Sequence, residues 1–176
     1  MRIRTLALAA TAAIALSGCA TVYESAADEV GTATITDRNG NNIGTAKLYS
    51  LAGEITLAVA LDGLPAGTHG VHLHTTGNCS AADFTSAGGH LNPGGAEHGT
   101  QNPRGAHLGD LPNATIGADG SGTVSTILRG TADTVLAQIF DADGTAFVVH
   151  AGPDDYRTDP AGDAGSRIAC GVFSRS

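Results

Sequence analysis

The chain contains few aromatic side chains and little charge. Aromatic residues make up 4% of its 176 residues, tryptophan is absent, and Asp, Glu, Lys and Arg together contribute 15%. Glycine, in contrast, occurs 25 times, and apolar residues amount to 41%. This composition favours short strands joined by many turns over long helices. The length is sufficient for one ordinary domain with its own core.

No run of 18 or more apolar residues occurs, so we expect no membrane-spanning helix. The N-terminus does carry an apolar run of eleven residues, LALAATAAIAL at positions 6–16, shortly after Arg2 and Arg4. A basic start followed by a short apolar stretch is typical of an export signal, and it predicts a signal peptide over residues 1–18. A buried helix is the alternative interpretation of this run.

The apolar run ends in LSGC at residues 16–19, which resembles the lipobox of bacterial lipoproteins. In a lipobox the cysteine becomes the lipidated first residue of the mature chain. We therefore expect lipidation at Cys19 and a tether over residues 19–30, followed by a single domain over residues 31–176. The protein would then be exported to the cell envelope or periplasm, and would touch a membrane only through this lipid anchor.

Basic residues are scarce in the chain that remains after residue 18. It keeps seven Lys and Arg against seventeen Asp and Glu, which is a formal net charge of −10. An acidic domain without a basic run is a poor binder of nucleic acid, so we expect no nucleic-acid partner.

Cysteine is also rare. Beyond Cys19 the chain holds only Cys79 and Cys170. In an exported protein two such cysteines usually form one disulfide, and two buried free thiols are the alternative.

From residue 31 onward, apolar and polar residues alternate in short stretches. In EITLAVAL at residues 54–61, every second residue is a large aliphatic one, as in a half-buried strand. Turn signals separate such stretches regularly, which predicts a β-sandwich or barrel. The expected strands cover residues 32–36, 43–49, 54–61, 69–75, 113–117, 122–128, 145–150 and 167–173.

Two segments interrupt the strand pattern. Residues 75–112 contain eight glycines and three prolines, and residues 151–166 are rich in Asp. A structureless loop as long as the first is uncommon in a compact domain unless it is functional or clamped.

The position of the histidines along the expected strands separates them into two faces. His69 shares a face with the apolar residues of its strand, whereas His72 and His74 lie on the opposite face. His150 lies opposite the apolar residues of a later strand in the same way. If the apolar faces form the core, these three histidines point outward from the barrel wall, where a loop can cover them.

The long loop carries further residues of the ligand type, namely His90, His98, His107 and Asp110. An outward histidine pair beside such a series predicts a metal site, because neutral imidazole is a ligand for both zinc and copper. A closed set of four ligands would hold the glycine-rich loop in place, as structural zinc does.

Six segments of the domain form a recognisable series. They are HGVHLHTTGNC, SAGGHLNP, EHG, AHLGDLPN, VVHAGPDDY and GDAGSRIACGV. In this order they resemble the copper/zinc superoxide dismutases, in particular the bacterial exported branch. The resemblance implies an all-β fold, an eight-stranded Greek-key barrel or sandwich, in which two long loops cover a metal site on the outer wall. The implied activity is the dismutation of superoxide into dioxygen and hydrogen peroxide.

The resemblance also implies two sets of metal ligands. The copper ligands fall on His72, His74, His90 and His150. The zinc ligands fall on His90, His98, His107 and Asp110. The shared His90 would bridge a copper centre and a structural zinc.

The remaining site residues of the family have counterparts here too. Asp154 corresponds to the carboxylate that joins a copper ligand to a zinc ligand, and His69 to a histidine that hydrogen-bonds inside the barrel. Cys79 and Cys170 correspond to the family disulfide, and Arg167 to the arginine beside the copper.

Catalysis in the implied reaction rests on two residues. His90 would take up and release a proton, and Arg167 would offer fixed donors and positive charge to the superoxide anion. One alternative is a non-catalytic copper/zinc-binding lipoprotein. A zinc hydrolase is another, but it needs an open zinc position and a general base, for which Glu97 is the only nearby candidate. Family members occur as monomers and as dimers, which leaves a homodimer open.

Overall fold

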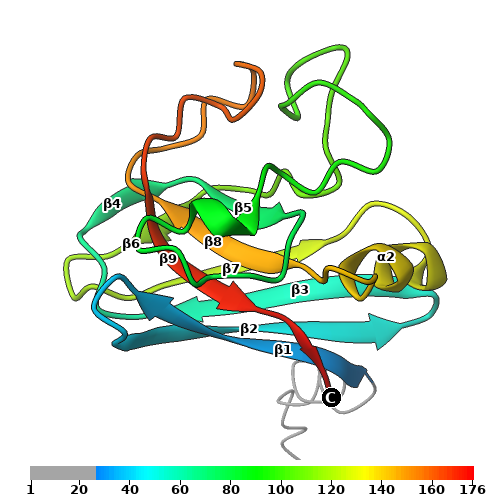
Figure 1. Ribbon diagram of the computed structural model, residues 1–176, viewed down its shortest axis with the longest axis horizontal. Coiled ribbons are helices and arrows are strands. Elements are labelled where there is room, and N and C mark those ends of the chain that lie inside the picture. Colours follow the sequence, from blue (N-terminus) through cyan, green and yellow to red (C-terminus); the bar gives the residue numbers. More distant parts are fainter. Residues whose placement is uncertain (1–26) are drawn as a thin grey trace, which may run out of the picture.

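The computed structural model describes residues 27–176 and shows a curled antiparallel sheet (Figure 1). Its strands are β1 (Asp28–Asp37), β2 (Asn42–Leu51), β3 (Glu54–Leu61), β4 (Gly67–His69), β5 (Val71–His74), β6 (Ala114–Ile116), β7 (Gly122–Ile127), β8 (Ala146–His150), β9 (Arg167–Val172) and β10 (Ser174–Arg175). The large sheet has the order β5-β8-β9-β1-β2-β3-β7, with β10 beside β1, and β4 pairs with β6 in a second sheet. The expected all-β fold is confirmed.

The N-terminal predictions fall almost entirely outside the described part of the chain. This holds for the signal peptide over residues 1–18, for Cys19, and for most of the tether over residues 19–30. The first strand, β1, begins at Asp28, three residues before the expected start of the domain.

The alternation of apolar residues places the core inside the curled sheet. In β3 every second residue is buried, as the pattern of EITLAVAL predicts. Fully buried side chains from four other strands meet this face, among them Ile35, Leu48, Leu73 and Phe147. The sheet is therefore sealed on its inner side, and its outer side is left for the loops.

The stretch expected as one strand over residues 69–75 is in fact two strands. β4 pairs with β6, whereas β5 pairs with β8, so the chain changes sheet at Gly70. The Gly70 N–H donates to Gly152 O at 2.7 Å, and a Cβ at Gly70 would lie 2.9 Å from the Ala164 side chain. This close approach of the 151–166 loop leaves no room for a side chain at Gly70.

One helix was not expected from the sequence. α2 (Ala132–Ile139) is capped at its N-terminus by Thr131, whose hydroxyl accepts a hydrogen bond from the Thr134 N–H at 3.4 Å. Val135 and Ile139, four residues apart, are its buried contacts with the core. Two turns are too few for a clear helical period in the sequence. Within residues 27–176, no helix has the length and apolar character needed to cross a membrane.

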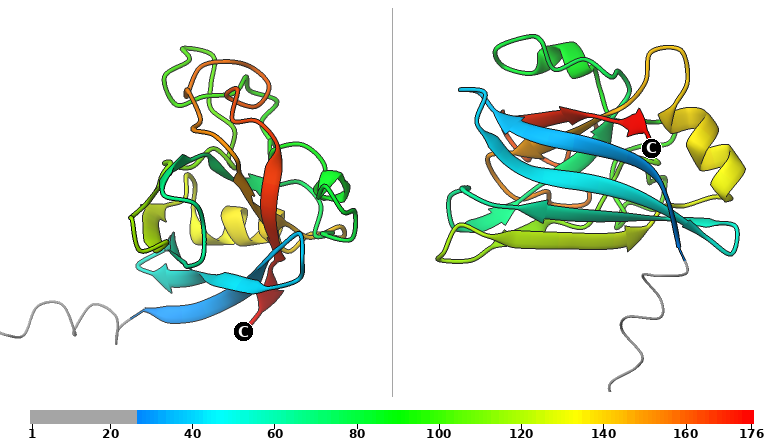
Figure 2. Two further views of the ribbon diagram at one scale, coloured as in Figure 1. Left: turned by 90° about the vertical axis from the view of Figure 1, so that its left-hand side faces the viewer. Right: turned by 90° about the horizontal axis from the view of Figure 1, so that it is seen from below.

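The two long loops rise side by side from the same side of the sheet (Figures 1 and 2). A disulfide between Cys79 and Cys170 ties the beginning of the 75–112 loop to β9, as predicted. Farther along, the loop forms isolated bridges from Asp110 to His72 and from His90 to His74. The long loop is thus clamped onto β5 rather than free, and it includes one short 3-10 helix, η1 (Thr85–Ala87).

Candidate metal centre

The register of two neighbouring strands brings the outward histidines together. In the antiparallel pair of β5 and β8, His72 lies opposite Val148 and His74 lies opposite Ala146. His150 is two residues beyond Val148 and therefore shares that face of the sheet. The exposed fractions of His72, His74 and His150 are 0%, 0% and 4%, because the loops cover them as expected.

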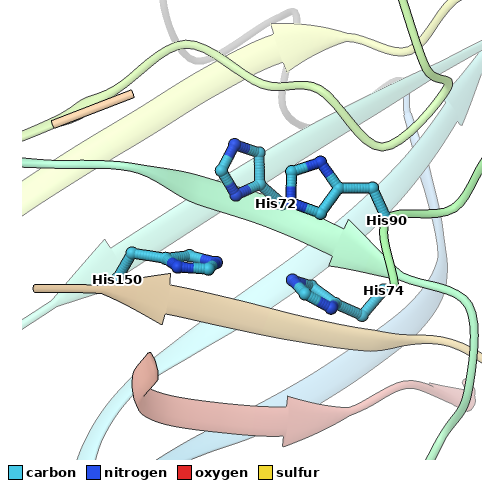
Figure 3. Close-up of side chains that lie close together, drawn as sticks. All are labelled: His72, His74, His90 and His150. Atoms are coloured by element: carbon cyan, nitrogen blue, oxygen red, sulfur yellow. The ribbon is translucent and has the colours of Figure 1, made fainter. Parts of the chain in front are cut away.

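The loop residue His90 completes a group that we call the strand cluster, namely His72, His74, His90 and His150 (Figure 3). One ring nitrogen from each of the four lies within 4.8 Å of the others. The rings of His72 and His90 are stacked, with centroids 3.9 Å apart. Figure 3 shows the four rings converging from β5, β8 and the loop.

Each histidine of the strand cluster has one buried nitrogen without a hydrogen-bond partner. These atoms are His72 Nδ1, His74 Nε2, His90 Nε2 and His150 Nε2. The other nitrogens are engaged: His74 Nδ1 contacts Gly88 O at 2.9 Å, and His150 Nδ1 contacts Gly165 O at 3.0 Å. An unsatisfied buried polar atom is costly, and four in one place fit a metal ion that would satisfy all of them.

A second group, the loop cluster, surrounds one carboxylate oxygen. Asp110 Oδ1 lies 3.0 Å from His90 Nδ1, 2.9 Å from His98 Nδ1 and 3.2 Å from His107 Nδ1. His98 Nδ1 makes this approach without hydrogen-bond geometry. Three imidazole nitrogens and one carboxylate oxygen are a donor set that suits a tetrahedral zinc site. His90 belongs to both clusters, with a different nitrogen directed to each.

His72 is also close enough to be counted with the loop cluster. His72, His90, His98 and Asp110 can bring one ligand atom each within 4.8 Å of the others. The Nε2 of His72, however, is bound to Asp154, and its Nδ1 belongs to the strand cluster. We therefore assign His107, whose Nδ1 faces Asp110 directly, as the fourth member of the loop cluster.

Asp154 links the two clusters. Its Oδ2 accepts a hydrogen bond from His72 Nε2 at 2.8 Å, and its Oδ1 accepts one from His98 Nε2 at 3.0 Å. A carboxylate in this position fixes the ring orientation and makes the other nitrogen a better ligand. A Cβ at Gly162 would collide with Asp154 Oδ1, and Gly162 has a φ of +64°, so both contacts and backbone require glycine there.

Burial keeps the strand cluster in the neutral form that binds metals. It lowers the pKa of His72 to about 3, of His74 to about 2 and of His150 to about 4. His98 differs because burial, which disfavours its charged form, is outweighed by the close Asp110 carboxylate and by the hydrogen bond to Asp154, and its pKa rises to about 9. In the metal-free chain His98 is therefore the charged partner of Asp110 and Asp154, whereas burial keeps His72, His74 and His150 neutral.

The pKa values of the two carboxylates beside His98 shift in the opposite direction, downward. Burial would raise the pKa of Asp110, but the hydrogen bond from His90 and the close, charged His98 outweigh it and hold that pKa well below its usual range. The same balance, with hydrogen bonds from His72 and His98, lowers the pKa of Asp154. Both side chains are therefore anionic at neutral pH, as metal or imidazole partners require.

An open pocket of about 400 Å³ gives access to the strand cluster. Its wall includes His74, His90, His150 and Arg167. Arg167 is paired with His150 across β8 and β9, so its Cα lies next to the strand cluster. A small anion that enters the pocket therefore meets a guanidinium beside the histidines.

His69 lies outside both clusters, as its position in the strand predicts. It is 5% exposed, its Nδ1 lies 2.8 Å from His150 O, and its Nε2 lies 3.0 Å from Pro65 O. Asn113, which pairs with the backbone of Asp154, was not predicted from the sequence. Asn113 Nδ2 donates to Asp154 O, and Asp154 N donates to Asn113 Oδ1, both at 2.9 Å. Its place at the end of the AHLGDLPN segment was the one available signal.

Comparison with known proteins identifies a family. The sequence profile described as copper/zinc superoxide dismutase matches residues 22–173. The chain is 40% identical over 165 residues to copper/zinc superoxide dismutase 1 of Aquifex aeolicus, covering 88% of this chain and 94% of that protein. It is 36% identical over 172 residues to the copper/zinc superoxide dismutase of Caulobacter vibrioides, covering 94% and 98% respectively.

Solved structures agree with this result. A superoxide dismutase-like protein from Bacillus subtilis superposes with a TM-score of 0.71 at 36% identity, covering 80% of this chain and 96% of that one. The copper/zinc superoxide dismutase from Brucella abortus gives a TM-score of 0.63 at 29% identity, covering 80% and 97%.

Proposed function

The chain belongs to the copper/zinc superoxide dismutase family, and we propose that its two clusters hold copper and zinc at a shared His90. The family and the relatives make the protein an enzyme that dismutes superoxide, with copper and zinc as its metals. The observation that carries the finer assignment is the set of four buried, unpartnered nitrogens in the strand cluster.

The donor atoms divide between the metals by chemistry and position. Copper would be held by Nδ1 of His72 and by Nε2 of His74, His90 and His150. Zinc would be held by Nδ1 of His90, His98 and His107 and by Asp110 Oδ1. Imidazole suits both metals, and three nitrogens with a carboxylate form the closed set of a structural zinc site.

Bound copper supplies the one-electron redox chemistry, which zinc cannot supply because it has no second accessible oxidation state. The chain's own residues handle the proton and the substrate. His90 would carry a proton at Nε2 only while that nitrogen is not bound to a metal, and would donate this proton to the superoxide ion that is reduced. Together with a proton from water this yields hydrogen peroxide, so that two superoxide ions and two protons give one dioxygen and one peroxide.

Arg167 recruits and orients the anion. Its guanidinium lies in the wall of the pocket and is held by two backbone carbonyls, so its charge has a fixed place. Asp154 and Asp110 keep the imidazoles in position during turnover. Asp154 accepts hydrogen bonds from two of them, and Asp110 lies within 3.0 Å of two. These groups are in place before substrate arrives, which lowers the cost of reorganisation.

The decisive measurement is the rate of superoxide decay with residues 20–176 loaded with both metals. We expect acceleration that disappears when copper is removed, returns when copper is restored, and persists in a chelator that captures free copper. A loaded protein that leaves the decay rate at its uncatalysed value would favour the non-catalytic copper/zinc-binding protein instead.

The geometry disfavours a zinc hydrolase. The loop cluster already offers four donors, which leaves no open zinc position for a water molecule. Glu97, the only candidate base from the sequence, is paired with Arg104 and accepts a hydrogen bond from Asn102 at 3.1 Å. It is therefore engaged at the surface of the loop.

We also propose that the protein acts outside the cytoplasm as a membrane-anchored lipoprotein. The signal-like residues 1–18 and the LSGC segment motivate this, and the Cys79–Cys170 disulfide supports it because such bonds persist in oxidising compartments. Fatty-acid labelling of the full chain, with Cys19→Ser as control, tests the anchor.

The homodimer is also a proposal, and sedimentation of the metal-loaded protein tests it.

A further inference from the structure

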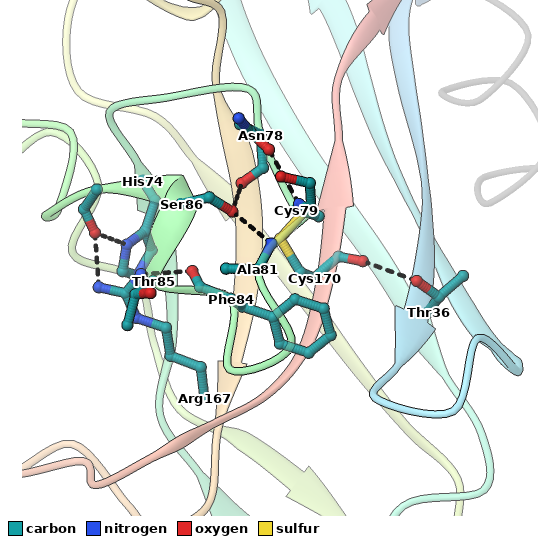
Figure 4. The surroundings of a disulfide bond; sticks show 12 residues. Thr36, His74, Asn78, Cys79, Ala81, Phe84, Thr85, Ser86, Arg167 and Cys170 are labelled. Atoms are coloured by element: carbon teal, nitrogen blue, oxygen red, sulfur yellow. Dashed lines mark hydrogen bonds between the residues drawn. A yellow bond between two sulfur atoms is a disulfide. The ribbon is translucent and has the colours of Figure 1, made fainter.

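The guanidinium of Arg167 is held by backbone carbonyls of the long loop (Figure 4). Arg167 Nη1 donates to Phe84 O at 2.7 Å, and Nη2 donates to Gly88 O at 2.6 Å. Gly88 O also accepts from His74 Nδ1, at 2.9 Å. Residues that place these two carbonyls therefore determine where the guanidinium lies relative to the strand cluster.

Phe84 has a backbone conformation that bulky residues rarely adopt. Its φ and ψ are 60° and 18°, in the left-handed region, and such a conformation persists where the surroundings impose it. Locally, Phe84 N donates to Ala81 O at 2.8 Å, and Asp83 Oδ1 accepts from Thr85 N at 3.1 Å. Because φ and ψ set the direction of a carbonyl, this turn decides where Phe84 O points.

The side chain of Phe84 is buried in a small apolar cluster outside the main core. The cluster consists of Phe84, Ala87, Ala146, Val148 and Cys170, with Cys79 packed against it. Val148 and Cys170 face each other across β8 and β9, on the outer side of the sheet that carries His72. The Phe84 ring, which is 5% exposed, thus fastens the loop to the sheet beside the disulfide.

We propose that Phe84 is a positioning residue for Arg167, because its buried ring anchors the strained turn whose carbonyl holds the guanidinium. The disulfide enters the loop five residues earlier, at Cys79, so the ring is the anchor nearer to the carbonyl. As far as the reaction rate is concerned, this inference rests on the proposed function. The placement of Arg167 can be tested without it.

The first test measures how fast an arginine-selective dicarbonyl reagent modifies Arg167 in the folded, metal-loaded chain, followed by mass spectrometry. Phe84→Ala should speed the modification about fivefold, the factor expected for losing one hydrogen bond. Phe84→Leu keeps an apolar anchor and should stay within about twofold of the natural chain, well below the effect of one lost hydrogen bond. Equal modification rates in the alanine variant and the natural chain overturn the proposal.

Phe84→Gly distinguishes the contribution of the buried ring from that of the strained backbone. Glycine adopts the left-handed conformation without strain, so this variant removes the ring and relieves the turn, and it also serves if the alanine variant does not fold. We expect it to behave like Phe84→Ala. Modification at the natural rate would show that the turn alone places the carbonyl, contrary to the proposal. Phe173→Ala is the matched control, because Phe173 is 6% exposed and packs in the main core, and it should leave Arg167 unchanged.

The second test is a double-mutant cycle on the superoxide decay rate per bound copper. Phe84→Ala should slow the natural chain about threefold or more, yet change the rate of an Arg167→Ala variant less than about 1.5-fold, because it acts through Arg167. Equal slowing in both backgrounds contradicts the proposal. If even the natural chain fails to accelerate decay, the proposed function fails, and the modification experiment still decides the placement of Arg167.

Discussion

The strand cluster and the loop cluster differ in what holds them. His72, His74 and His150 are positioned by the register of β5 and β8, and one loop residue completes the set. All four members of the loop cluster lie in residues 75–112, which contain no strand of the large sheet. The strand cluster is thus built with the barrel, whereas the loop cluster depends on the loop being folded over it.

The chemistry of the clusters follows the same division. The strand cluster is neutral and leaves four nitrogens unpartnered, and the loop cluster contains a carboxylate that three imidazoles surround. The packed sheet can keep these unpartnered imidazole nitrogens buried, because the stability of the rest of the fold offsets their cost. The imidazoles of the loop lack such support from the sheet. In the metal-free chain they are held by their contacts with the Asp110 carboxylate.

The largest effect that would separate the clusters is on zinc binding. Asp110→Asn removes the only carboxylate of the loop cluster, and we expect zinc affinity to fall about 100-fold or more. Copper affinity should change less than about tenfold, because the strands hold three of its four ligands. Competition titrations with chelators measure both affinities. An equal loss for the two metals would show that the strand cluster is no more preformed than the loop cluster.

The next effect concerns the pocket rather than the ligands. Arg167→Ala should slow superoxide decay about tenfold, the low end of rate gains from a focused field, while both metals stay bound. Arg167→Lys should recover part of this loss, because it restores the charge without the two-point attachment. The measurements are the decay rate per bound copper and the metal content. An unchanged rate would favour the copper/zinc-binding protein without catalysis.

In the metal-free chain the two clusters should limit stability at opposite ends of the pH range. Burial lowers the pKa of His72 to about 3 and of His150 to about 4, so the unfolded chain binds more protons below about pH 6.5 and stability falls with decreasing pH. His98, with its pKa raised to about 9 against the effect of burial, stabilises the fold below about pH 6.5, and this contribution is lost as the pH rises through 9.

Urea unfolding in a chelator, followed across pH, measures this profile. We expect the free energy of unfolding to be greatest near pH 6.5 and to decline on both sides. His98→Gln serves as the matched variant, because it should remove the alkaline decline and keep the acid one. A decline on the alkaline side that survives this substitution would assign it to another group.

The smallest expected effect is that of salt. The chain after residue 18 has a formal net charge of −10, and the 151–166 loop, whose Asp159 lines the pocket, carries four Asp and one Arg but no Lys. Attraction of superoxide should therefore be local, and its rate should fall less than fivefold between about 10 and about 200 mM salt. Stopped-flow decay at several salt concentrations measures this. A steeper fall would mean that distant charges, rather than Arg167, guide the anion.

Much of the candidate site could be predicted from the sequence because it depends on local order. The alternation in β5 and β8 places His72, His74 and His150 on the outer face, since side chains in a strand alternate strictly. The Cys79–Cys170 pairing was also predictable, because few cysteines leave few partners. In contrast, α2 and the break at Gly70 were missed, since neither two helical turns nor a close backbone approach leaves a periodic signal.

The sequence by itself determined the strand faces, the ligand types and the family, because side-chain chemistry and two-residue periodicity are properties of the chain alone. Tertiary structure decided which nitrogen of each histidine is free and that Phe84 O holds Arg167. It also decided that Asn113 supports Asp154. These contacts join residues far apart in the chain, and hydrogen-bond direction depends on how the loops pack against the sheet.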